Sequence, residues 1–143
     1  MDENEVIDAV CTYLIEEGYI IHSRLLTTQR GVDIEAEHSQ SKHRLYIEAK
    51  GGTSSRVGSN RFGKSYNHSQ VFDLSSKGVY AALVLRSKHP DREQEEVRLA
   101  APDTPLYRKY LEPIVDQLND AGIEILLVDE DRTVVPLVVA DKK

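Results

Sequence analysis

The stretches Gly31-Val-Asp-Ile-Glu-Ala-Glu37 and Arg44-Leu-Tyr-Ile-Glu-Ala-Lys50, which flank a short polar segment, decide the fold of this chain. In each stretch apolar and charged residues alternate, which is the pattern of a strand with one buried face. The segment between them, 39–42, reads Ser-Gln-Ser-Lys and suits a turn. The two stretches therefore predict a β-hairpin with one apolar face and one charged face.

The alternation also predicts the register of this hairpin. A hairpin closed about the middle of the turn pairs residues whose numbers sum to about 81. This register places Asp33 opposite Glu48 on the charged face and Ile34 opposite Ile47 on the apolar face. Lys50 lies on the same side of its strand as Glu48, because side chains alternate along a strand. The other expected pairs are Ala36 with Leu45 and Glu37 with Arg44.

Asp33, Glu48 and Lys50 are the residue types of a metal-dependent phosphodiesterase site. Mg²⁺ binds one or two carboxylates together with water and substrate phosphate. The backbone carbonyl of Ala49, between the two charged residues of the second strand, is available as a further oxygen ligand. An ammonium group beside the ion can lower the pKa of an attacking water or neutralise charge on the phosphorane. The trio therefore predicts a Mg²⁺ site, with Mn²⁺ as an alternative ion.

The charge of the chain is unevenly distributed. The net charge is −6, but residues 38–70 contain six Lys and Arg residues and one acid. A basic segment that follows the hairpin in an otherwise acidic chain indicates a groove for a phosphate backbone. A basic loop without a ligand is the alternative. The residues that we expect to contact nucleic acid are Arg56, Arg61, Lys64, Tyr66 and His68.

The first part of the chain predicts a core that begins with an amphipathic helix. Apolar residues from Val6 to Leu14 recur at helical spacing, and Gly18 ends this helix. Residues 51–65 contain four glycines and four serines and predict a long loop. Gly78 is expected to end a second helix, before a nearly all-apolar run that predicts a strand covered on both faces. The expected elements are helix 3–17, strands 19–26, 31–37 and 44–50, helix 66–77 and strand 79–85.

The rest of the chain predicts an extension of one helix and two strands. Residues 88–96 are highly charged and predict a surface loop. A helix is expected over 105–120, with a kink or a break at Pro113. Two strands follow, at 123–128 and 133–139, and Pro136 makes the second an edge strand. We expect residues 1–143 to form one domain, with its core at about 3–86 and its extension at about 105–139.

The order of these elements and the spacing of the charged trio resemble the PD-(D/E)xK nuclease superfamily. This superfamily includes type II restriction enzymes, Mrr-like enzymes and archaeal Holliday-junction resolvases. The resemblance rests on Asp33, followed about fifteen residues later by Glu48-Ala-Lys50. Val32 stands where the name-giving proline is found. The resemblance implies an α/β fold, with a restriction endonuclease-like three-layer α/β/α core in the order αβββαβ and a C-terminal αββ extension on a mixed sheet.

The resemblance also implies roles for individual residues. Asp33, Glu48 and the Ala49 carbonyl would hold Mg²⁺, and Lys50 would assist the nucleophilic water. The first helix of the family often contributes a glutamate, and Glu5 occupies that place here, where it would aid metal binding.

The second helix of the family often contributes a Gln or Lys, and Gln70 fits this part. Leu74 stands where an aromatic residue is often found one turn later. The implied activity is that of a Mg²⁺-dependent endonuclease that hydrolyses DNA phosphodiester bonds. The alternative is a catalytically inactive nuclease-fold module that binds nucleic acid or mediates assembly.

Partners and location follow from the same residues. The expected partner is DNA, whether duplex, branched or modified, and the apolar strands at the C-terminal end leave a homodimer open. No apolar run approaches the ~20 residues of a membrane span, and the acidic start Met1–Glu5 lacks the features of a signal peptide. We therefore expect a cytoplasmic protein without a membrane partner. Cys11 is expected to be an ordinary core thiol.

Overall fold

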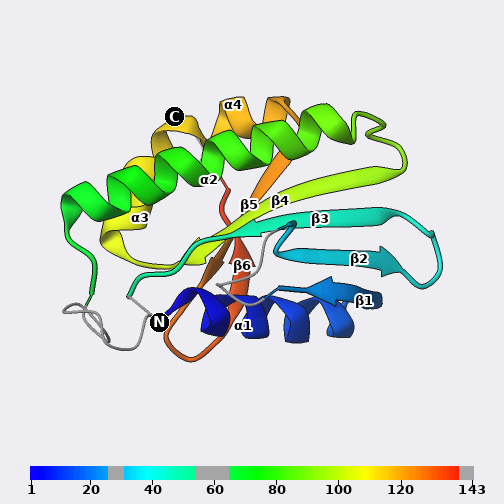
Figure 1. The fold of residues 1–143 in the computed structure, drawn as a ribbon, viewed down its shortest axis with the longest axis horizontal. Helices are drawn as coiled ribbons and strands as arrows, with labels where there is room; N and C mark the ends of the chain where they lie inside the picture. The colour runs from blue at the N-terminus through cyan, green and yellow to red at the C-terminus, as the bar shows by residue number, and fades with distance from the viewer. Residues whose placement is uncertain (26–30, 54–64, 139–143) are drawn as a thin grey trace.

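A mixed six-stranded β-sheet runs through the part of the chain that the computed structural model describes, which is residues 1–25, 31–53 and 65–138. The elements in chain order are α1 (Glu3–Glu16), β1 (Tyr19–Arg24), β2 (Ile34–His38), β3 (Arg44–Ala49), α2 (His68–Lys88), β4 (Glu95–Pro102), α3 (Pro105–Leu111), the 3₁₀ helix η1 (Glu112–Ile114), α4 (Val115–Asp120), β5 (Ile123–Val128) and β6 (Val134–Pro136). The strands lie side by side in sequence order (Figure 1). β3, β4 and β5 are parallel, whereas the other neighbours are antiparallel.

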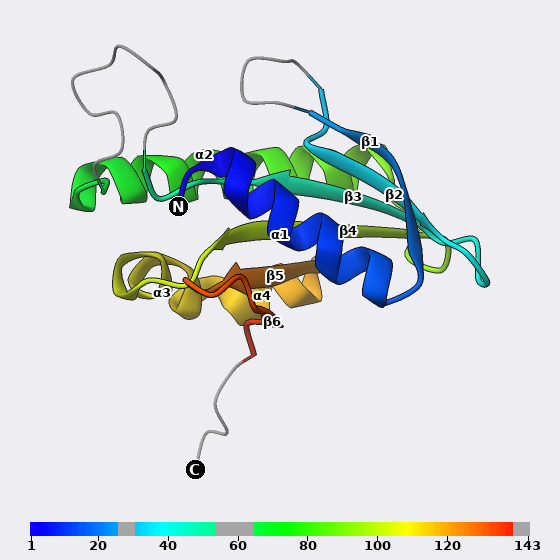
Figure 2. The ribbon, with the colours of Figure 1, turned by 90° about the horizontal axis from the view of Figure 1, so that it is seen from below.

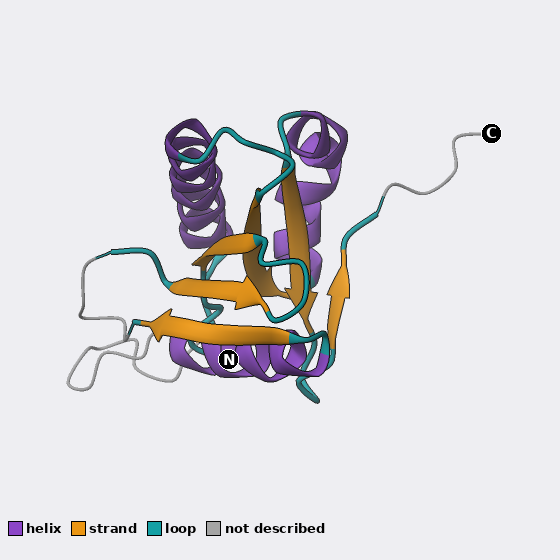
Figure 3. Ribbon diagram, turned by 90° about the vertical axis from the view of Figure 1, so that its right-hand side faces the viewer, coloured by secondary structure: helices purple, strands orange, loops and turns teal. Residues whose placement is uncertain are grey.

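Helices cover both faces of this sheet. α1 packs on one face, and α2 lies beside the α3–α4 segment on the other (Figure 3). Figure 2 shows α1 running across β3, β4 and β5. Alternation along β4 divides its side chains between the two layers, since Ala100 packs in the core beneath α1, whereas Leu99 and Ala101 pack beneath α2 and α3. The sheet is therefore buried on both sides at its parallel centre.

The predicted hairpin register is confirmed. β2 and β3 pair Ile34 with Ile47, Ala36 with Leu45 and Glu37 with Arg44. The apolar side chains of both strands are buried in the core beneath α1. A slip of one residue would turn these side chains to the charged face, so burial fixes the register. The charged face of the hairpin consequently lies on the side of the sheet that carries α2.

The predicted strand at 79–85 is wrong, because these residues belong to α2. The fourth strand is β4, which begins inside the segment predicted as a charged loop. An uninterrupted apolar run fits a buried helix as well as a buried strand. Here the burial of the side chains follows the period of a helix, since Ala82 and Leu85 are buried whereas Tyr80 and Leu83 are exposed. The core therefore extends to Pro102 and does not end near residue 86.

Gly78 does not end α2 but lies inside it, at a close contact with the sheet. A Cβ atom at this position would lie 3.0 Å from Leu99 Cδ1 and 3.2 Å from Lys50 Cγ. Both distances are too short for a side chain to be accommodated without movement of its neighbours. The helix tolerates the conformational cost of glycine here because the missing side chain lets α2 approach β3 and β4.

The C-terminal extension matches its prediction more closely. Pro113 lies in η1, which separates α3 from α4, so the expected break is confirmed. β6 pairs with β5 alone among the described strands and contains Pro136, as expected of an edge strand. Cys11 is buried in the core, and burial raises the pKa of its thiol to about 11. Among the described residues, no helix is long and apolar enough to cross a membrane.

Candidate active site

Asp33 lies immediately before β2 and reaches across to the end of β3. Its carboxylate Oδ2 accepts a hydrogen bond from the backbone N–H of Ala49 at 2.8 Å. Its own backbone carbonyl accepts a hydrogen bond from the N–H of Leu25 at 2.9 Å. Backbone groups on both sides thus hold Asp33, and the hairpin register carries its side chain to the charged face beside Glu48.

Glu48 and Lys50 form an ion pair on this face. Lys50 Nζ lies 3.2 Å from Glu48 Oε1, and the two side chains are 16% and 15% exposed. The carbon chain of Lys50 packs against Gly78 of α2, which leaves little room for it to take another path. An ammonium group held in this way presents its charge at a defined place, unlike a lysine on the open surface.

Asp33 and Glu48 share a hydrogen bond between their carboxyl groups. Burial is the largest cause that raises the pKa of each of them. Asp33 raises the pKa of Glu48 further, while the charge and hydrogen bond of Lys50 oppose the rise. For Asp33 the Ala49 amide, Lys50 and the shared bond all oppose the rise. Burial thus disfavours the charged form of both carboxyl groups.

Glu3 is a third carboxyl group at this site. Burial raises its pKa from 4.5 to about 7, and the charges of Asp33 and Glu48 add to the rise while Lys50 opposes it. Glu3 is the first residue of α1, where the helix dipole favours an anion by about 0.3–1 kcal/mol. Burial and like charge outweigh this effect, since a pKa raised from 4.5 to about 7 corresponds to about 3 kcal/mol.

Gly51 explains why Glu3 comes so close to the hairpin. A Cβ atom on Gly51 would overlap the backbone nitrogen of Glu3, so the end of β3 abuts the first turn of α1. The N–H groups of Gly52 and Thr53 both donate to the carbonyl of Met1, at 2.8 and 3.1 Å. The buried hydroxyl of Tyr107 donates to the Gly51 carbonyl at 2.6 Å. Backbone contacts thus fix the start of α1 beside Asp33 and Glu48.

Glu5, which we expected at this site, is used elsewhere. Its Oε1 accepts a hydrogen bond from the N–H of Asp2 at 3.1 Å, and its Oε2 pairs with Arg132. Asp2 in turn accepts from the N–H of Glu5 at 2.8 Å, which completes a capping box. The sequence contained this signal, because Asp followed three residues later by Glu predicts such a box. A capping role for Glu5 leaves Glu3 as the acid of this turn that faces the hairpin.

Gln70 occupies the corresponding position in α2. Its side-chain oxygen accepts from the N–H of Asn67 at 2.9 Å, and its own N–H donates to Asn67 Oδ1 at 3.0 Å. These two bonds form a second capping box. Among the described contacts, none joins Gln70 to Asp33, Glu48 or Lys50.

The residues expected to contact nucleic acid are described in part. Arg56, Arg61 and Lys64 lie outside the described residues. Tyr66 is half-buried, and its N–H donates to the carbonyl of Gly52 at 3.0 Å, just beyond Lys50. His68 is exposed at the first position of α2. Tyr66 is therefore the member of this set that the described structure brings close to the hairpin carboxyls.

The donor set suits a hard divalent cation. In the described ranges, no group of three or more His, Cys, Asp or Glu side chains is arranged as a ready-made metal site. Mg²⁺ requires fewer, because it keeps several waters and binds one or two carboxylates. Asp33 and Glu48 touch one another, and burial disfavours their charged forms. A cation between them would offset the cost of burying two negative charges, so these residues fit such an ion.

Comparisons with known proteins identify no family for this chain. No family model matches the chain, and no curated protein sequence matches it. Among solved structures, it is similar to SfsA from Pyrococcus furiosus, solved in complex with Ca²⁺, at 16% sequence identity and a TM-score of 0.39. The match covers 93% of this chain, and the chain spans 61% of the length of SfsA. The helices and the six-stranded sheet of the chain itself make it a mixed α/β protein.

Proposed function

We propose that this protein is a Mg²⁺-dependent endonuclease that hydrolyses DNA phosphodiester bonds. The observation that carries the proposal is the contact of Glu48 with both Asp33 and the ammonium group of Lys50, with Glu3 near enough for its pKa to respond to their charges. Perturbed titratable groups gathered around one point are typical of functional sites. If these residues only stabilised the fold, a single carboxylate would be sufficient to pair with Lys50.

Each residue has a distinct part in this proposal. Asp33, Glu48 and the Ala49 carbonyl would hold Mg²⁺, which when bound supplies a Lewis acid for a water and for the phosphate oxygens. Lys50 orients the attacking water and offsets the negative charge that develops on the phosphate. Glu3 takes the part expected of Glu5, and a pKa of about 7 suits it to accept a proton near neutral pH.

The order of elements supports a restriction endonuclease-like assignment of the fold. From α1 to β4 the order is αβββαβ, and a broken helix with two strands follows. Asp33 and Glu48 lie on the antiparallel hairpin of this core, where the PD-(D/E)xK resemblance expects them. The assignment of the chain to that superfamily remains part of the proposal.

Cleavage assays with matched variants test the proposal. We expect supercoiled plasmid or branched DNA to be cut in Mg²⁺ or Mn²⁺ but not in EDTA, with 5′-phosphate and 3′-hydroxyl products. Asp33→Asn and Lys50→Ala should each lower the rate by about 100-fold or more. Lys77→Ala is the control, because Lys77 pairs with Asp73 on the exposed face of α2. Equal rates in the wild type and all three variants would overturn the proposal.

A noncatalytic nucleic-acid-binding module is the second candidate. It is favoured by the contacts of Glu48, which shares a hydrogen bond with Asp33 and pairs with Lys50. Calorimetry separates the two candidates. Mg²⁺ binding that disappears in Asp33→Asn supports the nuclease, whereas salt-sensitive DNA binding without Mg²⁺ binding or cleavage supports the module.

A further inference from the structure

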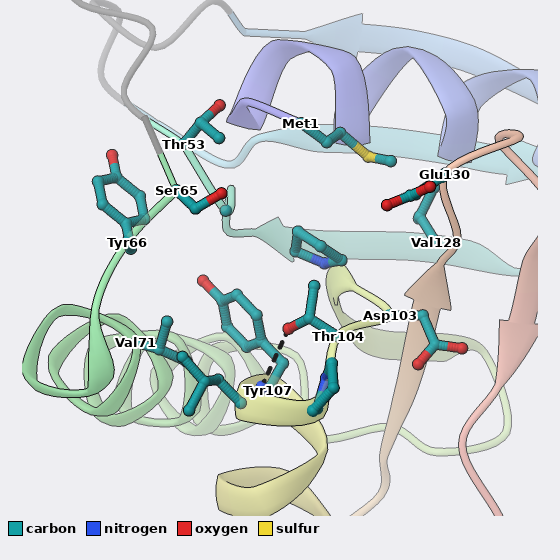
Figure 4. Close-up of a pocket in the computed structure, with 14 residues that line it drawn as sticks. Met1, Thr53, Ser65, Tyr66, Val71, Asp103, Thr104, Tyr107, Val128 and Glu130 are labelled. Atoms are coloured by element: carbon teal, nitrogen blue, oxygen red, sulfur yellow. Dashed lines mark hydrogen bonds between the residues drawn. The ribbon is translucent and has the colours of Figure 1, made fainter. Parts of the chain in front are cut away.

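A pocket of about 310 Å³ opens at one end of the sheet (Figure 4). Gly52, Pro102 and Val128 line it, and they lie at or just beyond the ends of β3, β4 and β5. These three strands are parallel, so the pocket lies outside the carboxyl ends of a parallel sheet. Open α/β sheets bind their ligands in this position.

The pocket and the charged trio share one backbone segment. Gly52 lies two residues beyond Lys50, so their Cα atoms are separated by at most about 7 Å. The same segment is fixed by the bond from Tyr107 to the Gly51 carbonyl and by the bond from Gly52 to Met1. The backbone that carries Lys50 therefore continues directly into the lining of the pocket.

The lining excludes some ligands and favours others. None of its described residues is Lys or Arg, and the carboxylate of Asp103 is bound by Arg108 at 2.6 and 3.1 Å. A phosphate group would find no cation in this lining. Apolar side chains such as Met1, Val71 and Leu106 form much of the wall. This chemistry suits a neutral group with a flat apolar surface.

Two further residues point to a nucleobase. Tyr66 and Glu130 lie on opposite sides of the pocket (Figure 4). An aromatic ring provides a surface on which a base stacks, and a carboxylate accepts hydrogen bonds from the exocyclic amino group of adenine, cytosine or guanine. The volume is at the lower limit of ligand pockets, which span about 300–1,000 Å³, so a single base fits the pocket better than a dinucleotide.

We propose that this pocket accepts one unstacked base of the strand whose phosphodiester lies at Asp33, Glu48 and Lys50. The proposal rests on the proposed nuclease function and names its substrate class, namely nucleic acid with an unpaired or extruded base. Tyr66 is held for this task by its bond to Gly52 and by the β-bridge between Thr53 and Ser65 at the pocket. A continuous perfect duplex would have to lose one base pair to fill the pocket.

Binding measurements in EDTA test the pocket without requiring cleavage. The probe is a short single strand with 2-aminopurine at one position. We expect Tyr66→Ala to weaken binding by about 5- to 100-fold, the range for loss of one stacked base. Tyr66→Phe should bind as the wild type does. Tyr80→Ala, which removes a tyrosine that is 71% exposed on α2, should also have no effect.

A strand that lacks one base provides the decisive comparison. Removing the base at the position of strongest 2-aminopurine response should weaken binding to the wild type by the same 5- to 100-fold, but should not weaken binding to Tyr66→Ala. Equal losses in both proteins would overturn the pocket proposal, even if Mg²⁺-dependent cleavage is observed. Base-dependent binding through Tyr66 without cleavage would overturn the nuclease proposal and leave the pocket standing.

Glu130→Gln separates hydrogen bonding from stacking. A carboxylate accepts from an amino group at either oxygen, whereas Gln offers one acceptor and one donor. The wild type should therefore prefer adenine or cytosine over thymine at the responsive position, and the variant should lose this preference. A preference that persists in Glu130→Gln would remove Glu130 from the proposal.

Discussion

The N-termini of α1 and α2 have the same local structure but different surroundings. Each begins with a capping box, formed by Asp2 and Glu5 in α1 and by Asn67 and Gln70 in α2. In α1 the first helical residue, Glu3, is packed against Gly51 and the hairpin carboxyls. In α2 the first helical residue, His68, is exposed. Local sequence therefore sets the cap, and tertiary contact decides whether the adjacent residue becomes part of a site.

The largest expected difference between the two helix starts is in catalysis. Glu3→Gln should lower Mg²⁺-dependent cleavage at pH 8 by about 100-fold, because it removes a carboxylate that faces Asp33 and Glu48. His68→Gln should change the rate by less than about 2-fold under the same conditions, if tertiary contact is what matters. Initial rates on a labelled branched substrate measure both. Similar losses of cleavage rate in the two variants would show that the different surroundings of the two helix starts do not affect catalysis.

The pH dependence of stability provides the next largest effect. Because the pKa of Glu3 is about 7 in the folded protein and 4.5 when unperturbed, the folded state binds more protons between these values. The contribution of Glu3 to folding stability is therefore complete below pH 4.5 and is lost as the pH rises through 7. This loss lowers the free energy of unfolding by about 3 kcal/mol. The raised pKa values of Asp33 and Glu48 act in the same direction.

Urea unfolding in EDTA at pH 5 and pH 8 measures this loss. Glu3→Gln should reduce the difference between the two pH values, whereas Glu93→Gln, at an exposed position, should not. Addition of Mg²⁺ should restore stability at pH 8 in the wild type but not in Asp33→Asn, because a ligand stabilises only the state that binds it. Superimposable pH profiles for the wild type and Glu3→Gln would contradict the assigned burial of Glu3.

The two capping boxes should contribute equally to the free energy of unfolding. Asp2→Ala and Asn67→Ala each remove the side-chain acceptor of a capping box and should each cost about 1 kcal/mol of unfolding free energy. Asp2→Asn, which keeps an acceptor oxygen, is the control for the first. A cost several times larger at one helix than at the other would show that the two boxes are not equivalent.

The smallest effect is expected at Glu5, the acid that the superfamily resemblance favoured. Glu5→Gln keeps the oxygen that caps α1 but loses the ion pair with Arg132. In this pair the side chains of Glu5 and Arg132 are 43% and 46% exposed. Exposed pairs of this kind contribute up to about 1 kcal/mol, and the cleavage rate should not change. A loss of cleavage as large as that of Glu3→Gln would return Glu5 to the site.

The hairpin was predictable from sequence because its signals are local. Alternation identifies the buried face, and a short turn leaves few registers that bury Ile34 and Ile47 together. This reasoning located Asp33, Glu48 and Lys50 correctly on one face. The break at Pro113 was predictable for the same reason, since proline interrupts a helix wherever the helix lies.

Glu3 and β4 were not predictable in this way. The close contact of Gly51 with α1 joins residues far apart in sequence, and the sequence of the first helical turn does not predict this contact. The strand β4 begins with two glutamates that look like loop residues, whereas the apolar run before it in sequence is helical. In both cases the deciding information is which distant surface a segment packs against. The capping boxes would have excluded Glu5 but would not have identified Glu3.

The hydrogen bond from Tyr107 to the Gly51 carbonyl joins two distant parts of the chain next to Lys50. Its partners are separated by 56 residues, and it lies buried between α3 and the end of β3. Contacts of long sequence separation form after local ones, because the chain between them must first be ordered. The hairpin can form from local contacts, but the Tyr107 bond forms only when α3 has docked beside the end of β3. A chain in which α3 has not docked therefore lacks one of the bonds that hold the backbone next to Lys50.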